Sequence, residues 1–108
     1  MTIHYASTFN EERLTAVENR LLDWLHQSSA ESLNNLAFHA LRTLKGTPPL
    51  EVLGVTDAYI DQDPSGLIFD IVCWVQYCAT GIKCYKIAFD NDCQPFALFA
   101  SATYARVE

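Results

Sequence analysis

Four cysteines are the residues of this 108-residue sequence that most readily bind metal ions or attack a substrate. Three of them, Cys73, Cys78 and Cys84, fall within DIVCWVQYCATGIKCYKI, residues 70–87, and the fourth is Cys93. A tetrahedral zinc site needs ligands that converge from tight turns such as C-x2-C. Spacings of five, six and nine residues supply no such turn. We therefore expect structural thiols, with no metal ion and no cofactor.

A cysteine nucleophile also needs a base within hydrogen-bond reach, most often a histidine. The sequence offers His4 near its start, His26 and His39. His26 falls at the end of a predicted helix, where a positive charge interacts favourably with the helix dipole. His39 lies beside an apolar stripe, as expected for a boundary or exposed position. The pattern favours a protein without catalytic activity.

The stretch DQDPSG, residues 61–66, is similar to the opening of a calcium-binding loop. An EF-hand needs a bidentate glutamate at its twelfth position, which here is Val72, and helices on both sides. Pro64, Ser65 and Gly66 are also what a tight turn requires. We predict a turn between two strands here. The other carboxylates show no spacing that singles out an acid–base pair.

The elements that position these groups begin with two amphipathic helices. In the first, over residues 8–27, the apolar stripe consists of Leu14, Val17, Leu21, Trp24 and Leu25. Thr8 to Glu11 fits a capping box at its start. In the second, which starts at Ser28–Glu31, the stripe consists of Leu33, Leu36, Ala37, Ala40, Leu41 and Leu44. Gly46 and the following prolines end it. The short link between the helices predicts an antiparallel helical hairpin.

After Pro49 the pattern alternates, and it predicts strands near 50–61, 67–78, 82–90 and 96–106 in an antiparallel meander. A three-residue loop, 79–81, would pair Cys78 with Ile82 and Val75 with Tyr85. The inward face then carries Phe69, Ile71, Cys73, Val75, Tyr77, Tyr85, Ile87 and Phe89. In the last strand Phe96, Leu98, Ala100, Ala102 and Tyr104 would point inward, and Phe99, Ser101 and Thr103 outward.

These elements define one α+β domain over residues 1–108, in which an N-terminal antiparallel helical hairpin packs on one face of a four-stranded antiparallel meander, in the order ααββββ. The opposite face is left to water or a partner. Its mixed polar and apolar character marks it as the candidate binding surface. The candidate partner-binding residues are Ile68, Val72, Trp74, Gln76, Lys86 and Phe99.

Composition narrows the function. Thirteen acidic against seven basic residues give a formal net charge of −6, which disfavours nucleic acid and anionic membranes as partners. No export signal is visible and no apolar run is long enough to cross a bilayer, so we expect a cytoplasmic protein with reduced thiols.

We interpret the chain as a protein-interaction module, such as an adaptor, an inhibitor or an immunity-like protein. Its partner is a protein of unknown identity, and it acts as a homodimer. The alternative is a small-ligand-binding domain or enzyme whose pocket lies between the helices and a curved sheet. A flat sheet with a filled core would favour the first interpretation, and a strongly curved sheet with a buried polar cavity would favour the second.

Overall fold

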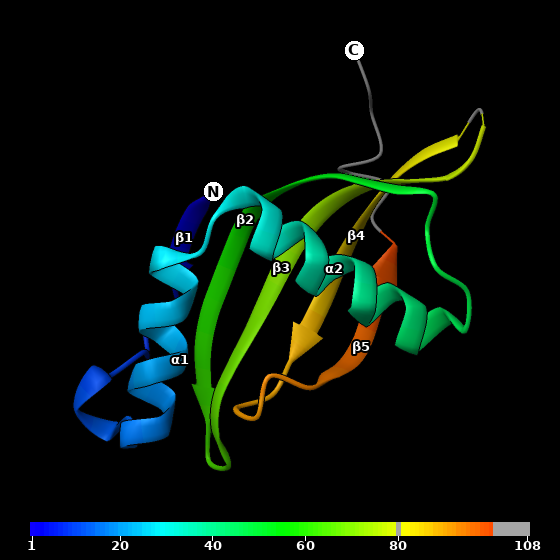
Figure 1. Cartoon of the computed structure of the whole chain (residues 1–108). Coiled ribbons are helices and arrows are strands. Elements are labelled where there is room, and N and C mark those ends of the chain that lie inside the picture. Colours follow the sequence, from blue (N-terminus) through cyan, green and yellow to red (C-terminus); the bar gives the residue numbers. More distant parts are fainter. Residues whose placement is uncertain (80, 101–108) are drawn as a thin grey trace.

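The structure, a computed structural model, describes residues 1–79 and 81–100. Two helices lie on one side of a five-stranded, mostly antiparallel sheet (Figure 1), which confirms the α+β class. None of the helices in these residues has the length and apolar character needed to cross a membrane. The elements are β1 (Thr2–Tyr5), the 3-10 turn η1 (Glu11–Arg13), α1 (Ala16–Gln27), α2 (Ala30–Lys45), β2 (Glu51–Asp63), β3 (Gly66–Cys78), β4 (Gly81–Phe89) and β5 (Pro95–Ala100).

The strands follow the order β1-β2-β3-β4-β5 across the sheet. From β2 to β5 they form the predicted antiparallel meander. The prediction of four strands, all antiparallel, was wrong in one respect, because β1 joins as a fifth strand parallel to β2 and pairs Thr2 with Asp57. A parallel pair needs a long crossover connection, and both helices lie within it. The alternation in four residues is too short to predict a strand whose partner is so distant in the sequence.

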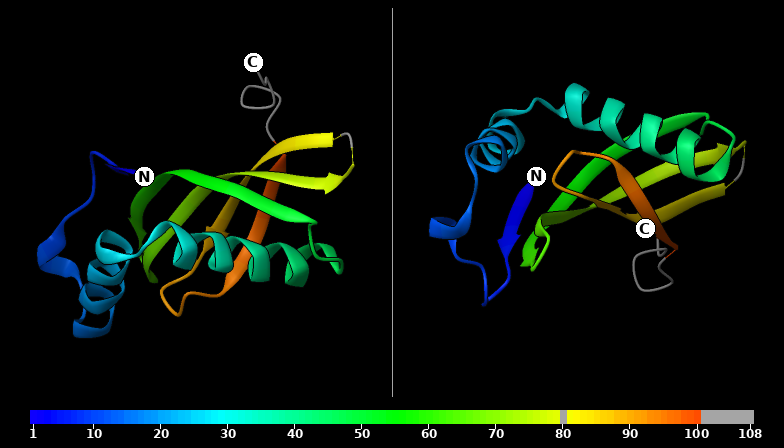
Figure 2. Two further views of the ribbon diagram at one scale, coloured as in Figure 1. Left: turned by 45° about the horizontal axis from the view of Figure 1, so that its top comes forward. Right: turned by 90° about the horizontal axis from the view of Figure 1, so that it is seen from below.

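Helix α2 lies across the inner face of the sheet (Figure 2). The predicted stripe is confirmed, because Leu33, Ala37, Ala40 and Leu41 are buried and the other two leucines pack against the core. The hydroxyl of Ser29 accepts the Ser32 amide at 3.1 Å and begins the helix. Gly46, with φ of 79°, ends it in the left-handed conformation that glycine adopts without strain.

The N-cap of helix α1 lies seven residues after the predicted cap. Thr15, not Thr8, forms the capping box: its hydroxyl accepts the Glu18 amide at 3.1 Å, and the Glu18 carboxylate accepts the Thr15 amide at 2.9 Å. Thr8 to Glu11 and Thr15 to Glu18 both fit the capping-box pattern. The second is the one used, and its glutamate, Glu18, also reaches the sheet. The predicted stripe was wrong for Val17 and Trp24, which are 54% and 40% exposed.

The predicted antiparallel helical hairpin is also wrong. Figures 1 and 2 show α1 at the β1 side of the molecule, while α2 turns away from it and runs over the sheet. Ser28 and Ser29 are both extended, so the chain changes direction between the helices instead of folding back. The inner face is therefore covered mainly by one helix.

The central hairpin pairs two residues away from the predicted register. Val75 lies opposite Lys83, and Cys78 opposite Gly81, with an irregularity after Gln76. Thr80, in the predicted loop, lies outside the described residues. Because side chains alternate between faces with a period of two, a shift of two residues leaves each side chain on its predicted face. The inner face is confirmed: Phe69, Ile71, Cys73, Val75, Tyr85, Ile87 and Phe89 are buried, and Tyr77 packs against them.

In β5, Leu98 packs against the core and Phe99 is exposed, as predicted. Phe96 was assigned inward, but it is 55% exposed. It is an extra residue at a bulge, because Ala88 pairs with Ala97 while Phe89 pairs with Pro95. Such an insertion turns a side chain out of the regular alternation. The assignments for residues 101–104 fall outside the described part of the chain.

Candidate functional site

The outer face is the side of the sheet opposite α2. The six predicted partner-binding residues lie on it: Ile68, Val72, Trp74 and Gln76 on β3, Lys86 on β4 and Phe99 on β5. Val72, Lys86 and Phe99 lie side by side across three strands, because Val72 pairs with Lys86 and Lys86 with Phe99. Residues directly opposite one another in antiparallel strands share a face.

The six predicted partner-binding residues differ in how much of each side chain is exposed to solvent. Phe99 is 53% exposed, and Ile68, Trp74 and Lys86 are half-buried. Val72 is only 1% exposed, so it offers almost no surface to a partner. Gln76 is half-buried, and its side-chain amide donates to the Ala79 carbonyl at 3.1 Å within the same hairpin. The accessible surface of the set therefore centres on the aromatic residues and the lysine. 

An ionic and aromatic network occupies the part of the outer face that β1, β2, β3 and β4 share. The imidazole of His4 stacks on the Tyr59 ring with 4.6 Å between centroids, and its Nε2 donates to Asp57 Oδ1 at 2.9 Å. Lys86 Nζ lies 5.4 Å from the centroid of the same ring and 3.5 Å from Asp70 Oδ2. The Tyr59 ring thus contacts both His4 and Lys86, and each of these two side chains pairs with a carboxylate.

The two carboxylates titrate differently. The hydrogen bond from His4 lowers the pKa of Asp57. Burial raises the pKa of Asp70, and the nearby charge of Lys86 opposes that rise. Sequence analysis missed this network, because His4 and Asp57 meet only through the parallel pairing of β1 with β2. The alternation of Thr2 to Tyr5 was the available signal.

Carboxylates outnumber cations on the outer face. Glu51 pairs with Gln76 and Asp61 with Ile68, so both share this face with Asp57 and Asp70. Among the described residues these four acids face one lysine, Lys86. The outer face is therefore acidic along β2 and β3, and Phe99 lies apart from these acids on β5.

Burial disfavours the thiolate form of three of the four cysteines, while Cys78 is exposed. Burial raises the pKa of Cys73 to about 12 and that of Cys84 to about 11, and it also raises the pKa of Cys93. A thiol rather than a thiolate is a poor nucleophile and a poor metal ligand. The described residues contain no disulfide, and no three of their His, Cys, Asp or Glu side chains are grouped to hold a metal ion. Cys73 points inward as predicted, and Cys84 lies opposite Trp74 rather than Cys78.

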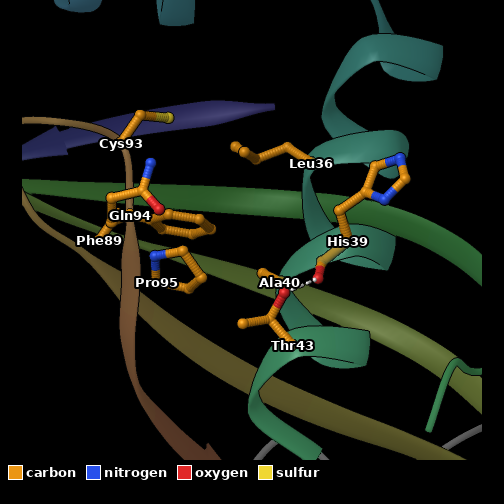
Figure 3. A pocket seen from close by; sticks show the side chains of 8 residues that line it. All are labelled: Leu36, His39, Ala40, Thr43, Phe89, Cys93, Gln94 and Pro95. Carbon is orange, nitrogen blue, oxygen red and sulfur yellow. Dashed lines mark hydrogen bonds between the residues drawn. The ribbon is translucent and has the colours of Figure 1, made fainter. Parts of the chain in front are cut away.

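A small pocket separates α2 from the loop between β4 and β5. Its volume is about 210 Å³, and it is lined by Leu36, His39, Ala40, Thr43, Phe89, Cys93, Gln94 and Pro95. Figure 3 shows the imidazole of His39 pointing away from the thiol of Cys93, so the two do not form a catalytic pair. The volume is below the roughly 300–1,000 Å³ of typical ligand sites.

A buried carboxylate joins three segments at the other end of the inner face. Glu18 Oε2 accepts the Leu67 amide at 2.7 Å and the side-chain amide of Asn91 at 3.2 Å, in addition to the bond that Oε1 accepts from Thr15. These bonds lower the pKa of Glu18, with the Leu67 amide as the largest cause. A Cβ at Gly66 would lie 2.5 Å from Glu18 Oε2, so glycine is required there. The carboxylate is engaged in structure rather than chemistry.

The stretch DQDPSG forms the predicted turn between two strands. Asp63 Oδ1 accepts the backbone amides of Ser65 and Gly66 at 2.8 and 3.2 Å. This Asx-type turn accounts for the acidic and small residues that are similar to a calcium loop.

Comparisons of the chain with protein-family models, with curated proteins and with solved structures find no match.

Proposed function

We propose that the protein is a non-catalytic interaction module that binds a protein partner through the outer face of its sheet. The observation that carries this proposal is the combination of exposed Phe99 and half-buried Trp74 with the network around Lys86. Large aromatic side chains supply much of the binding energy at protein interfaces. Charges already held in place lose less entropy when a partner binds.

The expected partner presents basic residues beside an apolar patch. Four carboxylates of the outer face lie on β2 and β3, and Lys86 on β4 lies between them and Phe99 on β5. Complementary charge steers association and excludes competing acidic surfaces. Binding is therefore expected to weaken as salt rises, because exposed charges are screened. The cytoplasm, where thiols stay reduced, is the proposed place of action.

The test compares Trp74→Glu with Val17→Glu, a matched charge introduced at an exposed position of α1. Proteins captured by the wild-type chain from the host lysate are identified, and each is purified for calorimetry against the three chains. We expect Trp74→Glu to weaken the interaction at least thirtyfold, about 2 kcal/mol, as at an interface hot spot. Val17→Glu should bind as wild type does.

Circular dichroism and thermal melting check that both variants fold. Equal binding by Trp74→Glu and wild type would refute the outer face as the interface. If no protein binds any of the chains, the small-ligand alternative gains weight, and a metabolite screen against the pocket beside α2 follows.

A further inference from the structure

Strand β5 is the last strand of the sheet. It pairs with β4 on one side, and on its other side no strand of residues 1–79 and 81–100 pairs with it (Figure 1). A strand at this position presents backbone N–H and C=O groups to its surroundings. These groups form strong hydrogen bonds and are templates for another strand.

The sequence of β5, PFALFA, does little to prevent such pairing. Natural proteins protect edge strands with lysines, prolines or bulges. In β5 the proline and the bulge both fall at the start, at Pro95 and Phe96, and leave Ala97–Ala100 regular and uncharged. The opposite edge, β1, is only four residues long and contains His4.

Charge favours a second copy of this chain at the β5 edge over one at the outer face. Each chain has a formal net charge of −6, so two copies repel over most orientations. The outer face carries four carboxylates, and two such faces would bring like charges together. Strand β5 carries no acidic residue, and the residue opposite Phe99 on β4 is Lys86.

We propose that two copies pair antiparallel through Ala97–Ala100, so that their sheets become one continuous sheet across a two-fold axis. Antiparallel strand pairing is self-complementary, as a two-fold interface requires. The axis stands perpendicular to the sheet, so both outer faces lie on the same side of the dimer. This inference specifies the homodimer predicted from the sequence, and it does not depend on partner binding at the outer face. Two outer faces held together would bind a repeated partner with increased avidity.

The experiment measures the mass of the full-length chain by sedimentation velocity over a thousandfold concentration range, with hydrogen exchange at both extremes. We expect the mass to double with concentration and exchange at residues 95–100 to slow at least tenfold in the dimer. Ala100→Lys, at an exposed position of β5, should raise the dimer dissociation constant at least tenfold, because it places like charges across the two-fold axis. Trp74→Glu should leave it unchanged.

A monomer at every concentration would overturn the proposal. So would a dimer that Trp74→Glu breaks and Ala100→Lys does not, since it would form through the outer face. A dimer without slower exchange at residues 95–100 would exclude this edge as well. Partner binding is measured on the Ala100→Lys chain separately, so loss of the dimer and failure of the proposed function give different results.

Discussion

Helix α2 is held to the sheet by apolar side chains, whereas helix α1 combines two buried leucines with a buried carboxylate. Leu33, Ala37, Ala40 and Leu41 of α2 are 0–4% exposed and face the inner side of the sheet. On α1 the buried residues are Leu22, Leu25 and Glu18, and Glu18 takes hydrogen bonds from a strand and from a loop. The free energy of burying apolar area tolerates small shifts, but hydrogen bonds require particular partners.

The largest expected effect is that of Leu41→Ala in α2. Leu41 is fully buried, so its truncation removes apolar contacts and leaves a cavity, at a cost of about 2–5 kcal/mol in the free energy of unfolding. Urea denaturation followed by circular dichroism measures the loss. Leu50→Ala, at a leucine that is 67% exposed, is the control and should cost less than about 0.5 kcal/mol. Equal effects would mean that α2 is not held by its apolar stripe.

Glu18→Gln tests the hydrogen-bonded junction of α1. The substitution replaces one carboxylate oxygen with an NH2 group, so at least one of the donors at Thr15, Leu67 and Asn91 loses its acceptor. We expect a loss of about 1–3 kcal/mol in the free energy of unfolding. Exposed Glu12 supplies the control Glu12→Gln. A loss no greater than that of the control would show that α1 depends on Leu22 and Leu25 alone.

The same junction predicts a dependence on pH. Hydrogen bonds lower the pKa of Glu18 in the folded chain below its ordinary value of 4.5. A lowered pKa adds stability that is complete above pH 4.5 and is lost as pH falls through the folded value. The difference in unfolding free energy between wild type and Glu18→Gln should therefore shrink below pH 4.5. Urea denaturation at pH 7, 4.5 and 3 measures it, and a constant difference would contradict the junction.

The smallest expected effects come from the helix caps, where the two helices are alike. Thr15 and Ser29 each accept a backbone amide at 3.1 Å. Thr15→Ala and Ser29→Ala should each cost about 1 kcal/mol of unfolding free energy. Thermal melts and urea denaturation of the two variants give the comparison. A much larger loss at Thr15 would mean that the Glu18 junction collapses without its cap.

The same contrast explains how much of the fold the sequence could predict. The boundaries of α2 were predictable to within one residue, because its stripe, the start signal at Ser28–Glu31 and Gly46 indicate nearly the observed ends, although the cap is Ser29. The faces of β3 and β4 were predictable because alternation survives a two-residue error in register. The start of α1 was not, since Thr8 and Thr15 both fit a capping signal and only a contact with Leu67 distinguishes them.

On the outer face, Trp74 and Phe99 were predictable from alternation, which assigns faces but not exposure. The burial of Val72 was not predictable, because it depends on neighbouring side chains that cover it. The network of His4, Asp57 and Tyr59 depends on β1, and no local pattern reports a pairing between such distant segments. The sequence therefore predicted which side chains share this face, Lys86 among them, and missed the pairing of His4 with Asp57.

The parallel pairing of β1 with β2 also bears on how the chain folds. The three hairpins of the meander join neighbouring segments, so little chain entropy is lost when they close. Both helices lie in the chain between Thr2 and Asp57, and contacts of such sequence separation form slowly. Strand β1 is thus expected to be the last element to join the sheet and the first to leave it. A tag fused to Met1 would therefore affect the step in which β1 joins the sheet.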